Sequence, residues 1–151
     1  MSIKNLAKSN MKYLPIFFFI LLFSCKPKEV KVTEKTFEDG SPKVVSVYKN
    51  NESKKDKLEE ISYHSNGKVF TQGKYQNGLK EGLWTSFYPN GTKWSETNFI
   101  KGINEGTTKT WYENGKIRYE GSYTKNNPSG IWKYWDMNGK VVFEKDYSKK
   151  Q

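Results

Sequence analysis

The sequence predicts an all-β fold: a single-layer antiparallel meander of repeated β-hairpins with a period of 24 residues. Three recurrences support this prediction: an Asn-Gly dipeptide, a second glycine between successive dipeptides, and aromatic residues at fixed positions. The dipeptides are Asn66-Gly67, Asn90-Gly91, Asn114-Gly115 and Asn138-Gly139, and the second glycines are Gly82, Gly106 and Gly130. The aromatic series are Tyr63, Phe87, Trp111 and Trp135, and Tyr75, Phe99, Tyr123 and Tyr147.

The composition fits a thin sheet better than a globule with a deep interior. Only 34% of the 151 residues are hydrophobic, but 16% are aromatic. Each aromatic side chain buries about 150–250 Å², so rings must supply much of the apolar contact.

The charge is basic, with a formal net value of +10 from 26 basic and 16 acidic residues. Without the three lysines of residues 1–12, 23 basic against 16 acidic residues leave +7. Lysines are spread along the whole chain, and Arg118 is the only arginine. Arginine is the usual reader of bases and phosphates. We therefore expect a solvated basic surface and no nucleic-acid partner.

Residues 1–24 are predicted to be a lipoprotein signal peptide. Three lysines precede an eleven-residue, mostly apolar run at 13–23. That run is shorter than the roughly 20 residues of a membrane-spanning helix. It ends in Leu22-Phe23-Ser24-Cys25, which resembles the lipobox of bacterial lipoproteins, where the cysteine receives a diacylglycerol and the signal is cut before it. Cys25, the only cysteine, is the predicted lipid-attachment site. The alternative is an ordinary cleaved signal with an incidental cysteine.

The rest of the chain is predicted to form four segments. Residues 25–36 are rich in Lys, Glu and Thr and read as a tether. Residues 37–57 are interpreted as a degenerate N-terminal capping repeat followed by a polar loop. Residues 58–147 hold the regular repeats, and 148–151 form a polar tail. The predicted meander has about eight or nine strands and no helix after the signal.

The predicted turns determine a register. Each Asn-Gly dipeptide is expected to supply the two central residues of a type I′ turn, and a second turn at 76–80, 101–104 and 125–129 joins one hairpin to the next. The resulting cross-strand pairs are Pro89–Thr92, Phe87–Trp94, Thr85–Glu96, Gly82–Phe99, Lys109–Glu120 and Lys133–Glu144. Two pairs join opposite charges, which supports the register. A ring lying over a strand glycine would explain the repeated pairing of glycine with an aromatic residue.

Strand alternation then separates two faces. The face expected to be packed holds Trp84, Tyr88, Phe99, Tyr112, Ile117, Tyr119, Trp132, Tyr134, Val141 and Phe143. The opposite, solvated face is expected to hold Phe87, Trp94, Trp111 and Trp135 among Glu96, Lys109, Glu120, Lys133 and Glu144.

The repeat resembles the MORN repeat in its bacterial variant, which occurs in many small lipoproteins and in proteins labelled antitoxin-like. The residues that carry the resemblance in one unit are Gly82, Trp84, Phe87, Tyr88, Asn90, Gly91, Glu96, Phe99 and Gly102. The resemblance covers residues 58–147 well and 37–48 weakly, and it implies hairpin architecture without a particular activity. The chain departs from the pattern at Thr108, which replaces a tryptophan, and at Lys145, which replaces a glycine.

The residues of a catalytic centre are missing from the sequence. His64 is the only histidine and stands beside a predicted turn, so no metal site and no Ser-His-Asp set is expected. The repeated glutamates occupy one repeat position and read as ladder members. We therefore expect no enzymatic activity, no cofactor and no small-molecule substrate.

The function expected is that of a lipid-anchored cell-envelope module that presents its β-repeat surface to a protein partner. Because Lys26 rather than aspartate follows the cysteine, the outer membrane is favoured if the cell has two membranes. The first alternative is an immunity or antitoxin-like protein that neutralises a partner toxin. The second is a glycan-binding surface lipoprotein. Exposed rings and one guanidinium define the candidate partner or glycan surface: Trp94, Trp111, Arg118 and Trp135.

Overall fold

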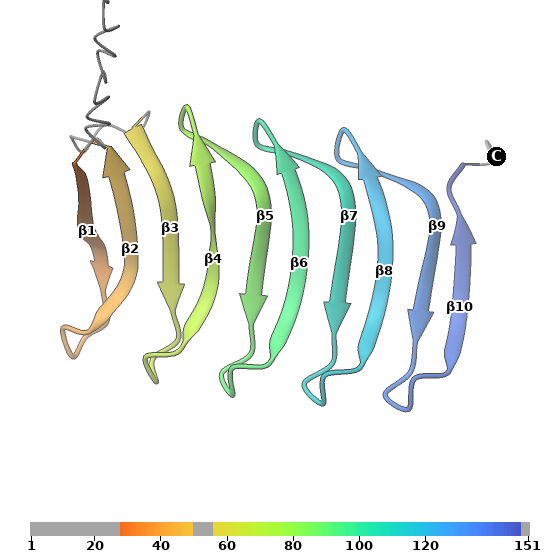
Figure 1. The fold of residues 1–151 in the computed structure, drawn as a ribbon. Coiled ribbons are helices and arrows are strands. Elements are labelled where there is room, and N and C mark those ends of the chain that lie inside the picture. Colours follow the sequence, from red (N-terminus) through yellow and green to blue (C-terminus); the bar gives the residue numbers. More distant parts are fainter. Residues whose placement is uncertain (1–27, 50–55, 149–151) are drawn as a thin grey trace, which may run out of the picture.

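The computed structural model describes residues 28–49 and 56–148, which form ten strands (Figure 1). The strands are β1 Glu29–Thr36, β2 Pro42–Lys49, β3 Lys57–Tyr63, β4 Val69–Gln76, β5 Leu79–Phe87, β6 Lys93–Ile100, β7 Ile103–Trp111, β8 Ile117–Thr124, β9 Asn127–Trp135 and β10 Val141–Asp146. The predicted signal peptide, Cys25 and the end of the predicted tail lie outside the described residues, as does most of the predicted polar loop.

All ten strands belong to one open antiparallel sheet whose spatial order follows the chain order from β1 to β10. Figure 1 shows them side by side in a single layer, with no described element over either face. The predicted all-β meander is therefore confirmed. At about 4.8 Å between neighbouring strands, the ten strands span roughly 43 Å.

The four Asn-Gly loops that recur every 24 residues, at 66–67, 90–91, 114–115 and 138–139, do not form the predicted type I′ turns. In the β5–β6 loop, the Gly91 N–H donates to the Tyr88 carbonyl at 2.8 Å, and the Tyr88 N–H donates to the Thr92 carbonyl at 2.8 Å. Gly91 has a φ of +93°, whereas Asn90 is not among the residues with positive φ. This is a three-residue loop, a type I turn followed by a glycine in the left-handed region. The Asn90 side chain accepts the Thr92 N–H at 2.8 Å, which stabilises this loop.

Type I′ turns occur at the opposite ends of the strands, in the second set of turns. The central residues of the β4–β5 turn, Asn77 and Gly78, have φ values of 53° and 79°. The flanking Gln76 and Leu79 pair directly, as expected for a two-residue loop. The β6–β7 and β8–β9 turns have the same form, with central residues Lys101-Gly102 and Lys125-Asn126.

The extra loop residue changes the register close to each three-residue loop. Thr85 pairs with Glu96 and Gly82 with Phe99, as predicted. Phe87, however, pairs with Lys93 instead of Trp94, because the register shifts between Ser86 and Phe87. The expected Phe87–Trp94 and Pro89–Thr92 pairs are therefore wrong, since Tyr88 is the residue that bonds to Thr92.

The explanation predicted for the second glycines is also wrong. A β-carbon built on Gly82 would meet nothing within 4 Å, so the Phe99 ring does not cover it. Gly82 has a φ of +69°, and it lies beside a break in the β4–β5 pairing, between Gln72–Thr85 and Lys74–Glu81. The glycine is needed because a β-bulge at this point requires the left-handed backbone conformation.

The segment predicted as a tether is in large part a strand. Residues Glu29–Thr36 form β1, which pairs with β2 from Glu29–Lys49 to Thr36–Pro42. The β1–β2 loop repeats the three-residue form, with Gly40 donating to the Phe37 carbonyl at 3.0 Å. The N-terminal unit is thus a complete hairpin. Its outer strand resembles a tether in sequence because edge strands carry charged residues that discourage further pairing.

Candidate binding surfaces

The aromatic face consists of rings that contact one another across strands. A first cluster joins Trp84 to Tyr75 and Phe99, with ring centroids 5.4 and 6.2 Å apart. A second cluster surrounds Trp132 and contains Tyr119, Tyr123, Tyr134, Phe143 and Tyr147. Trp84 and Trp132 are only 6% and 4% exposed. Edge-to-face and stacked ring pairs replace the second layer that a sandwich would supply.

The two buried tryptophans require glycine on the neighbouring strand. A β-carbon on Gly121 would lie 2.7 Å from Cγ of Trp132 and still closer to its six-membered ring. The same arrangement joins Gly73 to Trp84, at 2.5 Å from Cγ. The Trp132 indole N–H also donates to the Ser122 carbonyl at 3.1 Å. Each indole therefore lies flat on bare backbone and is held there by a hydrogen bond.

In the middle repeat, threonine replaces both the glycine and the tryptophan of this pair. Thr97 and Thr108 pair across β6 and β7, and their hydroxyl oxygens lie 2.9 Å apart. Thr108 is buried and also donates to the Glu96 carbonyl at 3.1 Å. A patch of hydroxyl groups consequently separates the two aromatic clusters. The departure noted at Thr108 in the sequence is thus matched by the loss of the glycine at Thr97.

The opposite face, here called the ion-pair face, carries a row of alternating charges. Cross-strand pairing places the charges next to one another in the order Glu96, Lys109, Glu120, Lys133, Glu144. Two predicted pairs form ion pairs, Lys109–Glu120 at 3.2 Å and Lys133–Glu144 at 3.3 Å. Each contributes roughly 0.2–1 kcal/mol at this exposure. The main role of this row is to favour the observed pairing register of the strands.

The predicted candidate surface divides into two columns. Trp94 and Arg118 occupy the same repeat position, and each contacts the tyrosine at the start of its own loop: Trp94 lies 6.2 Å from Tyr88, and Arg118 lies 5.8 Å from Tyr112. Trp94 also stacks on Phe70. The expectation that Tyr88 and Trp94 lie on opposite faces is therefore wrong. Trp94 is the extra residue between the Ser86–Ser95 and Phe87–Lys93 pairs.

Trp111 and Trp135 form the second column. Their backbone carbonyls link each repeat to the one before it. The Trp111 carbonyl accepts the Tyr88 hydroxyl at 2.8 Å, and the Trp135 carbonyl accepts the Tyr112 hydroxyl at 2.8 Å. His64 takes the equivalent place in the first regular repeat, with Nε2 2.9 Å from the Phe87 carbonyl. Its geometry matches the structural role expected for a histidine beside a turn.

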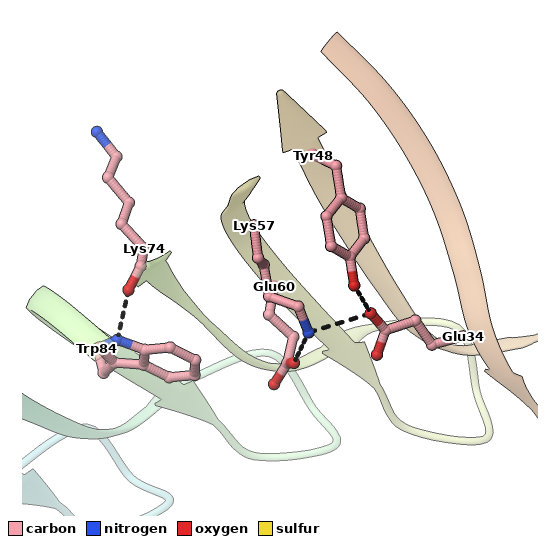
Figure 2. Close-up of polar contacts among 6 residues, drawn as sticks. All are labelled: Glu34, Tyr48, Lys57, Glu60, Lys74 and Trp84. Carbon is pink, nitrogen blue, oxygen red and sulfur yellow. Dashed lines mark hydrogen bonds and ion pairs between the residues drawn. The ribbon is translucent and has the colours of Figure 1, made fainter. Parts of the chain in front are cut away.

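A polar cluster joins the N-terminal hairpin to the first regular repeat (Figure 2). The Lys57 ammonium lies 2.8 Å from Glu60 and 3.1 Å from Glu34, and the Tyr48 hydroxyl donates to Glu34. The same ammonium lies over the Tyr48 and Tyr75 rings. Partial burial lowers the pKa of Lys57, but hydrogen bonds and charge from both glutamates outweigh it and raise that pKa well above its usual value.

This cluster lines a recess of about 260 Å³ that also includes Gly78. Because the Lys57 pKa is raised, its amine stays protonated at neutral pH and contributes a positive charge to the recess. Within residues 28–49 and 56–148, no group of three or more His, Cys, Asp or Glu residues is arranged to hold a metal ion. The same residues contain no helix long and apolar enough to cross a membrane. The contacts of Lys57 and Tyr48 with Glu34 make the cluster an ionic clasp between the N-terminal hairpin and β3.

Two glutamates were not singled out by the sequence. Glu81 accepts the backbone N–H of Lys101 at 2.8 Å, and Glu105 accepts that of Lys125 at 2.8 Å. Both N–H groups belong to the first central residue of a type I′ turn. The 24-residue spacing of Glu81 and Glu105 was visible in the sequence, but their partners depend on the turn type.

The family comparison agrees with this geometry. Three segments, residues 58–77, 80–101 and 104–125, match the family described as MORN repeat variant. A search of curated proteins finds no match to the chain. The hairpin geometry continues beyond the matched segments, into β1–β2 on one side and β9–β10 on the other. The chain therefore contains three MORN repeats of the variant type, within a longer run of the same hairpins.

Proposed function

We propose that this protein is a lipid-anchored binding module of the cell envelope that presents the aromatic face to a protein partner. The observation that supports this proposal best is the aromatic face itself. Nine large rings lie on one side of a single-layer sheet with no described layer above them: Tyr75, Trp84, Phe99, Tyr119, Tyr123, Trp132, Tyr134, Phe143 and Tyr147. MORN repeats suggest a repeat-based binding or scaffold module, and clusters of partly exposed rings of this kind mark interaction sites.

The two clusters offer a partner two apolar areas on either side of a hydroxyl patch. Trp84 on β5 and Trp132 on β9 are four strands apart, or roughly 19 Å. The central Thr97–Thr108 pair satisfies its own hydrogen bonds, so a partner does not need to supply them. The exposed ring edges around the tryptophans are the expected anchors, since aromatic residues dominate binding energy at protein interfaces.

Photo-crosslinking in cells tests the binding face. A photoreactive phenylalanine analogue at Phe99 lies on the aromatic face, and one at Leu83, which is 48% exposed and pairs with Asn98, lies on the other. We expect one defined protein adduct from Phe99, and from Tyr134, but none from Leu83. Adducts from Leu83 alone would contradict the proposed face.

Metabolic labelling with a fatty-acid analogue tests the anchor. The lipobox-like sequence before Cys25 predicts that the chain incorporates the label and that Cys25→Ser abolishes incorporation. Label that persists in Cys25→Ser would refute lipid attachment at this residue. A single stoichiometric toxin in detergent co-purifications would instead favour the immunity function.

A further inference from the structure

The two outer strands of the sheet are protected differently. β1 has the sequence EVKVTEKT, with charged residues along its length and register shifts near Lys35. Charges and irregular pairing are the usual defences of an edge strand. β10 begins with three consecutive exposed apolar residues: Val141, Val142 and Phe143 are 43%, 59% and 54% exposed. Among the described residues, no strand lies beyond β10 (Figure 1).

The backbone of β10 offers hydrogen bonds on its outer side. The Tyr147 N–H donates inward, to the Gly130 carbonyl of β9 at 2.8 Å. Backbone groups of an antiparallel strand alternate in direction along the chain. The N–H and C=O of Glu144, three residues earlier, therefore point outward, where an additional strand would lie.

The charge row indicates which residue an added strand would need. Glu96 on β6 and Glu120 on β8 belong to strands that have a neighbour on both sides. Each faces a lysine on the next strand in the chain, Lys109 on β7 and Lys133 on β9 respectively. Among the described residues, Glu144 pairs only with Lys133, and its side chain is 49% exposed. A strand that continued the pattern would place a basic residue opposite Glu144.

The next position restricts the added strand further. Lys145 occupies the repeat position of Gly121, on which the Trp132 indole lies. A tryptophan cannot lie flat on Lys145, so a strand with the Trp-Lys pattern of β9 does not fit. The middle repeat supplies the alternative, because Thr108 and Lys109 of β7 face Thr97 and Glu96. A small residue followed by a basic one is therefore the expected pattern.

We propose that β10 is a docking edge that accepts an extended segment of a partner protein as an additional antiparallel strand. The segment has a basic residue opposite Glu144 and a small residue opposite Lys145. Main-chain hydrogen bonds would supply affinity and the two side-chain positions specificity, as in other cases of strand addition. β10 also contributes Phe143 to the aromatic face, but this inference concerns the outer backbone edge of the strand and does not depend on lipid attachment.

Fluorescence anisotropy with a labelled peptide of the β7 sequence, residues 103–111, tests the proposal on the purified full-length protein in mild detergent. This peptide carries the Thr-Lys pattern of Thr108 and Lys109. We expect saturable binding that weakens at least tenfold in Glu144→Lys. A peptide with Lys109→Glu should bind wild type weakly and Glu144→Lys well. The matched control is Glu38→Lys, the same charge change in the exposed β1–β2 loop, which should leave binding unchanged.

Two further variants separate backbone pairing from charge. Glu144→Ala removes the carboxylate but keeps the outward N–H. Glu144→Pro removes both, and proline is tolerated on edge strands where the N–H faces solvent. We expect it to abolish peptide binding while circular dichroism and the melting temperature stay near wild type. Three results would overturn the proposal: no saturable binding, equal weakening by Glu38→Lys and Glu144→Lys, or equal affinity for a β9 peptide of residues 127–135. A concentration-dependent dimer lost in Glu144→Pro would show that a second copy occupies the edge instead.

Discussion

The close approach of Trp132 to Gly121 can be tested by converting this pair into the pair that the middle repeat uses. Gly121→Thr places a side chain where the indole lies, since even a β-carbon there would be 2.7 Å from Cγ of Trp132. The ring must move, at a cost of about 1–3 kcal/mol for overpacking. It also leaves its hydrogen bond to the Ser122 carbonyl, which is worth about 0.5–1.5 kcal/mol.

Trp132→Thr alone should cost about 3–5 kcal/mol, because a side chain that is only 4% exposed is removed from the centre of its cluster. The double variant recreates the Thr97–Thr108 arrangement, in which two hydroxyl groups lie 2.9 Å apart. With the indole absent, Gly121→Thr should cost little or even stabilise the sheet. The expected coupling free energy between the two positions is about 1–3 kcal/mol.

Guanidinium titrations followed by far-UV circular dichroism would measure this cycle, with the slope of each transition compared to confirm unchanged cooperativity. Gly73→Thr combined with Trp132→Thr is the control, because Gly73 contacts Trp84 in the other cluster and the two changes should add. The reasoning is refuted if Gly121→Thr costs the same free energy with and without Trp132.

Three further predictions concern a glycine, the histidine and the ionic clasp. Gly82→Ala should destabilise the sheet by about 1–2 kcal/mol, because the backbone φ at Gly82 is +69°, although there is open space for a β-carbon. A semisynthetic protein with D-alanine at this position should have the melting temperature of wild type. Equal destabilisation by both enantiomers would implicate steric contacts instead. His64→Ala should cost about 0.5–1.5 kcal/mol of stability by removing the contact with the Phe87 carbonyl. His64→Tyr should cost less, because Tyr88 and Tyr112 make the equivalent hydrogen bond in the later repeats. Equal melting temperatures for the two variants would contradict this. Partial burial raises the pKa of Glu34, but hydrogen bonds from Tyr48 and Lys57 outweigh it and leave that pKa below its ordinary 4.5. The stability that Glu34 contributes is therefore present above pH 4.5 and is lost as the pH falls through the lowered pKa. Glu34→Gln should flatten this part of the stability curve, and an unchanged acid limb in urea titrations would argue against the clasp.

Much of the architecture could be predicted because the repeat constrains many residues in the same way. The constant spacing of Asn-Gly and of the aromatic series predicted the meander, and the Lys109–Glu120 and Lys133–Glu144 pairs predicted the central register. These features depend on strand alternation and on which residues tolerate a turn. Both properties can be read from the chain itself.

The turn type, the first strand and the side-chain contacts between strands were decided only in three dimensions. Asn-Gly is compatible with two loops, and the hydrogen bond from the Thr92 N–H to the Asn90 side chain favours the longer one, which adds Pro89 to Asn90 and Gly91. β1 is polar because it is an edge strand, so its sequence alone resembles a tether. The pairing of Trp132 with Gly121 depends on which neighbouring strand the indole leans over, and that choice is made by packing between strands, which is not determined by one strand's sequence alone.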